Sequence, residues 1–136
     1  MVKVLKLGAT HTITKLVTPD LTADHYGNEG VAVFATPALV ALLEETAVGC
    51  IAAALEAGQG SVGAEVMVQH LVPTPVGMVV EGRAELIEID GRWLVFKVEA
   101  WDEQEKIATG THTRYIINSI EKFLQRAAEK TSPRQD

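Results

Sequence analysis

Residues 36–57 read TPALVALLEETAVGCIAAALEA, and this stretch decides the fold. It is rich in helix-forming residues, Pro37 is favoured at the first helical position, and Gly58 follows its end. We therefore predict a helix from Pro37 to about Ala57. Thr36 is expected to be its N-cap, with the side-chain oxygen accepting a backbone N–H.

Apolar side chains cover most of the circumference of this predicted helix and leave a narrow strip that holds Glu45 and Glu56. The helix should therefore be almost enclosed by its own protein. Glu44 lies inside the apolar arc, and we expect it to be buried. Because a buried ionised carboxylate is costly unless it is paired or hydrogen-bonded, a functional role for Glu44 is favoured over a rotated helix that leaves it in water.

The flanking sequence predicts an antiparallel sheet over this helix. The expected strands lie at residues 9–17 and at about residues 62–73, 77–89, 92–102 and 105–118. Asp90-Gly91 is a strong hairpin signal. Short connections indicate a meander of the last four strands, and the amphipathic segment from Ile120 to Ala127 should pack on the outside as a terminal helix.

Length and composition indicate one compact unit. The chain has 136 residues, of which 47% are apolar, so we expect a single domain over residues 1–130 and a flexible tail over residues 131–136. The net charge of -6, without a Lys/Arg cluster, argues against a nucleic-acid partner. No apolar run approaches the length of a membrane span and no secretory leader is recognised, so we expect a cytoplasmic protein without a membrane partner.

The only cysteine is Cys50, which excludes an intramolecular disulfide and is consistent with a reducing compartment. It lies within the predicted helix without a neighbouring base, so core packing is favoured over a role as nucleophile. The glycines at positions 58, 60 and 63 lack the Lys-Ser/Thr of a phosphate loop and are explained by a helix-to-strand connection.

His70 shares the face of its predicted strand with Val66 and Val68. A single histidine on an apolar face is more often a hydrogen-bonded core residue than a catalyst. The catalytic interpretation depends on His70 meeting Glu44 and Thr36 where the strand packs on the helix, which would join a base, a carboxylate and a hydroxyl. The helix N-terminus would also offer N–H groups to a developing oxyanion.

His112 shares a strand face with Gly110 and Arg114, so either a polar site or a structural hydrogen bond lies beneath that strand, and we assign it no catalytic role. His11 has no assigned place. The pair Asp24-His25 lies in a predicted loop.

Several segments resemble the fluoroacetyl-CoA thioesterase-like family. Residues 34–44, FATPALVALLE, look like the start of the central helix of that family. Residues 60–63 (GSVG), His70, residues 74–77 (TPVG) and residues 110–114 (GTHTR) follow in the same order and spacing.

This resemblance implies an α+β hot-dog fold, in which a five-stranded antiparallel sheet wraps a long central helix and a C-terminal helix follows. It implies a homodimer with two acyl-CoA sites at the subunit interface. The residues that match the catalytic group of the family are Thr36, Glu44 and His70. Gly63 resembles a glycine near the bound acyl group, and Arg114 resembles an arginine near the site. No metal and no cofactor are expected.

The expected reaction is hydrolysis of a short-chain acyl-CoA thioester to the free acid and CoA. Thr36 and Glu44 would form the nucleophilic or water-orienting group, and His70 would act as general acid/base. The family enzyme that selects fluoroacetate carries phenylalanines in a lid before the central helix, whereas residues 27–32 here read GNEGVA, so a different short acyl group is expected.

Two alternatives stay open at this point. A non-catalytic acyl-CoA binding or sensing module would keep the pocket but would need no contact between Glu44 and His70. A hot-dog hydratase or dehydratase would need its own Asp/His pair, for which only Asp24-His25 is available.

Overall fold

The computed structural model describes residues 4–131 of the chain. Residues 132–136, which make up most of the predicted flexible tail, lie outside the described residues. Thr131 ends a 3-10 turn (η3, Glu129–Thr131) that follows the last helix.

The predicted strands and helices are confirmed, with shifted ends. The elements are β1 (Thr10–Leu16), η1 (Pro19–Leu21), α1 (Thr36–Ile51), η2 (Ala52–Ala54), β2 (Gly60–His70), β3 (Val79–Asp90), β4 (Trp93–Trp101), β5 (Lys106–Ile117) and α2 (Ile120–Ala128). The regular part of the long helix ends at Ile51, earlier than predicted. The chain then tightens into η2 and reverses at Gly58, which has a φ of 83°, to enter β2.

Thr36 is not the N-cap of α1, contrary to the sequence prediction. Ala35 holds that position in an extended conformation and Thr36 is the first helical residue, without a side-chain cap hydrogen bond. The hydroxyl of Thr36 instead lies 2.8 Å from Nδ1 of His70. The Thr36 hydroxyl therefore contacts His70, a residue distant in sequence, instead of capping the start of α1 as the N-cap preference predicted.

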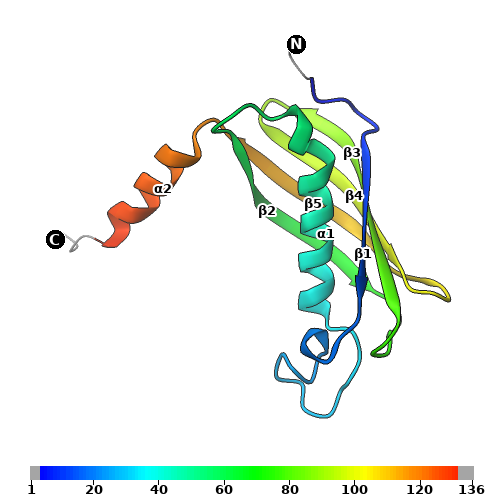
Figure 1. Ribbon diagram of the computed structural model, residues 1–136. Helices are drawn as coiled ribbons and strands as arrows, with labels where there is room; N and C mark the ends of the chain where they lie inside the picture. Colours follow the sequence, from blue (N-terminus) through cyan, green and yellow to red (C-terminus); the bar gives the residue numbers. More distant parts are fainter. Residues whose placement is uncertain (1–3, 132–136) are drawn as a thin grey trace.

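The five strands form one antiparallel sheet in the order β1-β3-β4-β5-β2. The meander is correct for β3, β4 and β5, and the Asp90-Gly91 hairpin is confirmed by the pairing of Asp90 with Trp93. The predicted meander is wrong for β2. This strand pairs with β5 at one edge of the sheet, while β1 pairs with β3 at the other edge (Figure 1).

The segment between β2 and β3 explains this order. Pro73 and Pro75 cannot donate hydrogen bonds to a ladder, so the chain leaves the sheet there. It pairs instead with the segment before α1, where the N–H of Phe34 donates to the carbonyl of Thr74 at 2.8 Å. β3 therefore starts on the far side of β5 and β4.

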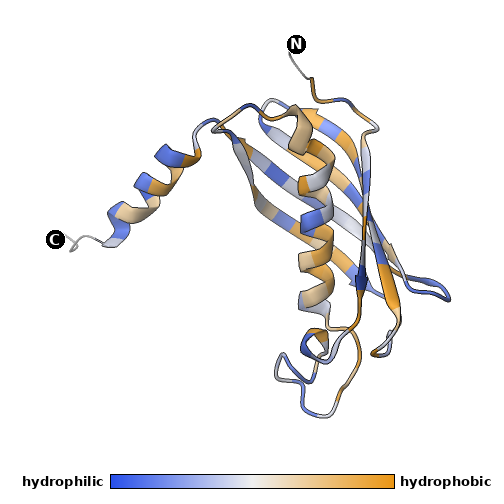
Figure 2. Ribbon diagram, in the orientation of Figure 1, coloured by the Kyte–Doolittle hydropathy of each residue, from blue (hydrophilic) through white to orange (hydrophobic). Residues whose placement is uncertain are grey.

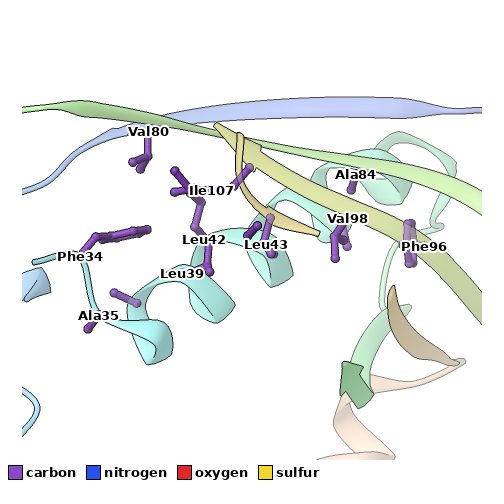
Figure 3. Packing of buried hydrophobic residues seen from close by; sticks show 14 of the residues in the cluster. Phe34, Ala35, Leu39, Leu42, Leu43, Val80, Ala84, Phe96, Val98 and Ile107 are labelled. Atoms are coloured by element: carbon purple, nitrogen blue, oxygen red, sulfur yellow. The ribbon is translucent and has the colours of Figure 1, made fainter. Parts of the chain in front are cut away.

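Helix α1 lies across one face of the sheet and supplies the centre of the core (Figure 1). Its Leu39, Leu42 and Leu43 are buried and gather beside sheet residues that include Ile107 and Val98 (Figure 3). Fully burying one such side chain stabilises the fold by about 1.5–3 kcal/mol. The site described below is thus built on a rigid helix and sheet.

The segment Thr36–Ala54 has the length and hydropathy of a membrane span, contrary to the expectation that no such run exists. Its apolar residues include the leucines of the core just described, so it is the central helix of a packed domain.

One side of α1 is open, which corrects the prediction of a nearly enclosed helix. Val48 and Glu45 are exposed, and 43% of the Glu44 side chain is accessible, although Glu44 was expected to be buried. The helix packs on the sheet with the opposite side, and only a single face of it is covered within this chain.

Helix α2 projects away from the body of the domain instead of packing on it as predicted (Figure 1). Ser119 caps it by accepting a hydrogen bond from the N–H of Lys122 at 3.1 Å. Hydrophobic and hydrophilic residues alternate along it (Figure 2), and none of its residues is buried. Phe123 and Leu124 are exposed, so the apolar face of α2 is uncovered in the single chain.

Candidate active site

Thr36 and His70 form a hydrogen-bonded pair where the start of α1 meets the end of β2. Thr36 Oγ1 lies 2.8 Å from His70 Nδ1, and the edge of the Phe34 ring packs against the imidazole with a centroid separation of 6.4 Å. Burial lowers the pKa of His70 because the charged imidazolium loses hydration. His70 is therefore held in its neutral form, which can accept a proton.

The second ring nitrogen of His70, Nε2, is buried and has no hydrogen-bond partner among the described residues. A hollow of about 270 Å³ adjoins the pair and is lined by Val31, Phe34 and Val72, among others. A hollow beside a base and a hydroxyl can receive a small group next to reactive atoms.

Glu44 and Arg114 form a second group about two helical turns away. Arg114 Nη1 lies 3.6 Å from Glu44 Oε2. The guanidinium is buried, and it donates from Nε to Ser61 Oγ at 2.8 Å and from Nη2 to the Ser61 carbonyl at 2.9 Å. Ser61 was missed in the sequence analysis. Its position two residues before Gly63, on the same strand face, was the available signal.

Gly63 keeps this group compact. A Cβ at Gly63 would lie 3.3 Å from Glu44 Oε2, 3.3 Å from His112 Cε1 and 3.4 Å from Arg114 Nη1. The sequence analysis named Gly63 and Arg114 separately, and the fold places them beside each other. A hydrogen atom is the only substituent that leaves the carboxylate and guanidinium undisturbed at this position.

A bulge in β2 brings Gly63 and His70 to the same face of the sheet. Strand residues alternate between faces, so residues separated by an odd number point to opposite sides. The register of β2 against β5 shifts between Gly63 and Glu65, which inserts one extra residue and cancels the alternation. Both half-sites therefore open on the side of the sheet that carries α1.

The structure does not bring Glu44 to His70 within one chain. Thr36 and Glu44 are both on α1, eight positions apart, which at about 1.5 Å per residue separates them by about 12 Å. A second hollow, of about 400 Å³, lies beside Glu44 and Arg114 on the open side of α1. The predicted three-residue group is thus split into a Thr36–His70 half and a Glu44–Arg114 half.

Other residues named in the sequence analysis lie outside these halves. Asp24 accepts a hydrogen bond from the N–H of Gly30 at 2.7 Å, and the ring of His25 packs on Tyr26, so the loop gives no Asp/His pair at a hollow. Cys50 Sγ lies 3.3 Å from the Ala84 carbonyl, and burial raises the pKa of its thiol to about 11. Core packing is confirmed for Cys50.

Within residues 4–131, no group of three or more His, Cys, Asp or Glu side chains is arranged to hold a metal ion.

A family model described as fluoroacetyl-CoA-specific thioesterase matches residues 17–120. The chain belongs to this family. It is 36% identical over 133 residues to the fluoroacetyl-CoA thioesterase of Streptantibioticus cattleyicolor, a match that covers 93% of this chain and 95% of that protein. The resemblance inferred from the sequence motifs is confirmed.

Solved structures agree with the family assignment. A mutant of the fluoroacetyl-CoA-specific thioesterase in complex with fluoroacetate and CoA is 37% identical, with a TM-score of 0.82 and coverage of 87% of this chain and 98% of that one. A hot-dog-like protein from Thermanaerovibrio acidaminovorans, 23% identical, has a TM-score of 0.87 and covers 96% of both chains. The predicted hot-dog fold is confirmed.

Proposed function

We propose that this thioesterase-family chain hydrolyses a short-chain acyl-CoA thioester to the free acid and CoA. The observation that carries the proposal is the Thr36–His70 pair, in which a hydroxyl meets a neutral imidazole beside a small hollow in a chain of this family. A base hydrogen-bonded to a hydroxyl is the arrangement needed to activate an oxygen nucleophile. The catalytic residues proposed are Thr36, Glu44 and His70.

We further propose a homodimer in which each site combines the Thr36–His70 half of one subunit with the Glu44–Arg114 half of the other. Strand β2 supports this arrangement because it is an edge strand with backbone groups free to pair. Met67 is 65% exposed on β2, and Leu71, just after β2, and Val48, on the open side of α1, are exposed as well. A second copy would cover these apolar side chains and the open side of α1.

Antiparallel pairing of two β2 strands would place the start of one beside the end of the other. Gly63 lies near the start and His70 at the end, on the same face. The carboxylate of Glu44 from one subunit would then approach the partnerless Nε2 of His70 from the other. The two-fold symmetry of the dimer would thus bring together the Thr36–His70 half and the Glu44–Arg114 half, which are separated within one chain.

In the proposed mechanism, neutral His70 accepts the proton of the attacking oxygen, and the Glu44 carboxylate orients that oxygen or its water. The imidazolium that results is stabilised by the carboxylate and returns its proton to the departing CoA thiolate. The N–H groups of the first turn of α1 would face the oxyanion. A burst of thiol in a single turnover would distinguish an acyl-Thr36 intermediate from direct attack by water.

The substrate is proposed to carry a short acyl group. The hollow beside His70, at about 270 Å³, is smaller than the roughly 300–1,000 Å³ typical of drug-sized ligand pockets. Residues 27–32 carry no phenylalanine, so we propose an acyl group other than fluoroacetyl. Gly63 and Arg114 are proposed as substrate-contacting residues beside the thioester. We propose that the reaction needs no metal or cofactor and takes place in the cytoplasm.

A second candidate function is an acyl-CoA binding or sensing module without catalysis. The similarity to a thioesterase family does not favour this alternative, and the proposed dimer accounts for the missing Glu44–His70 contact within one chain. This candidate predicts acyl-CoA binding without thiol release.

The decisive experiment is thiol release from acyl-CoAs of increasing chain length, with fluoroacetyl-CoA included, by the wild type and by His70→Ala. Hydrolysis of one chain class that is lost in the variant supports the thioesterase. Binding without release across the series supports the sensing module instead.

The proposed site shared between two subunits can be tested separately, because His70→Ala and Glu44→Ala each inactivate a different half of it. Mixing the two inactive variants after unfolding and refolding gives one intact site in each heterodimer. Because half of the dimers are then mixed, about a quarter of the wild-type activity should return. No recovery would place all three residues of each site in the same chain.

A further inference from the structure

His112 is a buried titratable residue that the proposed mechanism does not use. It lies on β5 with 1% exposure, two positions before Arg114 and on the same inward face. The sequence analysis left its role open between a polar site and a structural hydrogen bond. Its contacts in the folded chain resolve this choice.

The hydrogen bonds of His112 fix its tautomer. Arginine side chains donate hydrogen bonds and cannot accept them, so the 3.1 Å contact with Arg114 Nη1 requires an unprotonated Nε2 on His112. The proton then lies on Nδ1, which donates to the Glu65 carbonyl at 2.8 Å. The Glu65 carbonyl belongs to the bulged segment of β2, so His112 ties that bulge to Arg114.

The groups around His112 favour its neutral state. Burial lowers the pKa of His112; the Glu65 carbonyl and the Glu44 carboxylate act against this effect, and the Arg114 charge adds to it. The Phe96 ring from β4 packs beside the imidazole at a centroid distance of 6.3 Å and adds no charge. Protonation would remove the acceptor of Arg114 and place two cations in contact.

The guanidinium of Arg114 is held from three directions. Ser61 accepts from Nε and from Nη2, and His112 accepts from Nη1. The remaining hydrogen on Nη1 is then free to point toward Glu44, 3.6 Å away. Without the His112 acceptor only Ser61 would hold the guanidinium, and the whole planar group could tilt and move Nη1 away from the carboxylate.

We propose that His112 is a positioning residue, whose neutral Nε2 fixes the Arg114 guanidinium so that Arg114 holds Glu44 in place for thioester hydrolysis. The consequence for hydrolysis rests on the proposed function, whereas the contact with Arg114 does not. His112 itself does not touch the reacting atoms in this scheme.

The kinetic test compares His112→Phe, His112→Asn and His112→Gln. Phenylalanine fills the space without hydrogen bonds, asparagine keeps a donor near Nδ1, and glutamine can present an oxygen near Nε2. We expect kcat to fall about tenfold in the Phe and Asn variants, with KM changed less than about twofold, and to recover in part in His112→Gln. Thr111→Val, on the exposed face of the same strand, should keep wild-type kinetics.

A double-mutant cycle separates positioning from general damage to the fold. If His112 acts through Arg114, His112→Asn should cost little further activity in an Arg114→Ala background. Full additivity of the two losses, with thermal unfolding matched to wild type, would overturn the proposal. A kcat of His112→Gln no higher than that of His112→Phe would also overturn the proposal.

The contact has a readout that does not depend on activity. Long-range proton–nitrogen NMR spectra of histidine-labelled protein at pH 8 should show His112 as the Nδ1–H tautomer, with its Nε2 resonance shifted in Arg114→Ala. An Nε2–H tautomer, or titration near the ordinary histidine pKa of about 6.5, would overturn the assignment. If the wild type binds acyl-CoA without hydrolysing it, the proposed function fails while this measurement still tests the His112–Arg114 contact.

Discussion

Replacement of Gly63 by alanine tests the geometry of the Glu44–Arg114 half-site most directly. The added methyl group would lie 3.3 Å from the Glu44 carboxylate oxygen and 3.3 Å from the His112 ring, closer than nine in ten real contacts of a Cβ. His112 and Arg114 are 1% and 5% exposed and cannot move, whereas 43% of the Glu44 side chain is accessible. We therefore expect Glu44 to swing outward and its distance from Arg114 to increase.

The expected loss follows from the size of that movement. A misplacement of about 1 Å can reduce a rate by about 100-fold. A shift of a few tenths of an ångström should therefore lower kcat/KM about tenfold, which corresponds to about 1.4 kcal/mol of transition-state stabilisation. The stability should change by less than about 1 kcal/mol, because alanine restrains the unfolded chain more than glycine does and offsets part of the strain.

Gly82→Ala is the matched control, because Gly82 also faces α1 but away from the site. Its added methyl group would lie 3.1 Å from Leu42 Cγ and 3.1 Å from Thr46 Oγ1, which are both fully buried. No exposed neighbour can yield there, so overpacking should cost about 1–3 kcal/mol of stability while kcat/KM of the folded enzyme is unchanged. Thiol-release kinetics and urea denaturation measure both quantities. Unchanged kcat/KM in Gly63→Ala would refute the reasoning.

Three further outcomes are expected. Thr36→Val should lower kcat by about 10²–10⁴-fold because His70 loses its hydroxyl partner, and Thr36→Ser should retain activity in a thiol-release assay; equal losses in both would contradict the hydroxyl role. The lowered pKa values of His70 and His112 mean that the unfolded chain binds more protons than the folded chain just below pH 6.5. Their contribution to the free energy of unfolding is therefore complete above about that pH and declines as pH falls. Urea denaturation across pH 5–8 would measure this decline, and equal unfolding free energies throughout that range would argue against it. Cys50, whose thiol pKa is raised to about 11, should react with a thiol reagent at pH 7.5 much faster in denaturant than in the native protein, and equal rates would exclude its burial.

The sequence alone determined the helices and strands and the inward faces of β3 and β4. A run of helix-forming residues between Pro37 and Gly58 located α1, and alternation of apolar and polar residues located β3 and β4, because burial of one face imposes a period of two on a strand. The Asp90-Gly91 turn was readable because a hairpin needs a positive φ, which is 61° at Gly91. The motifs around Thr36, His70 and Arg114 were also sufficient to indicate the family, because they occur in the same order and spacing along the chain.

Only the tertiary structure decided which groups meet. Strand β2 lies at the edge beside β5, since pairing between distant segments depends on the whole sheet and not on the length of a connection. Thr36 bonds to His70 instead of capping α1, and Glu44 is open to solvent beside Arg114, because a helical wheel gives a direction but not the neighbour found there. Ser61 and His112 became visible as supports of Arg114 only when β2 paired with β5, because the sequence placed His112 on the face of Arg114 but did not show their hydrogen bonds.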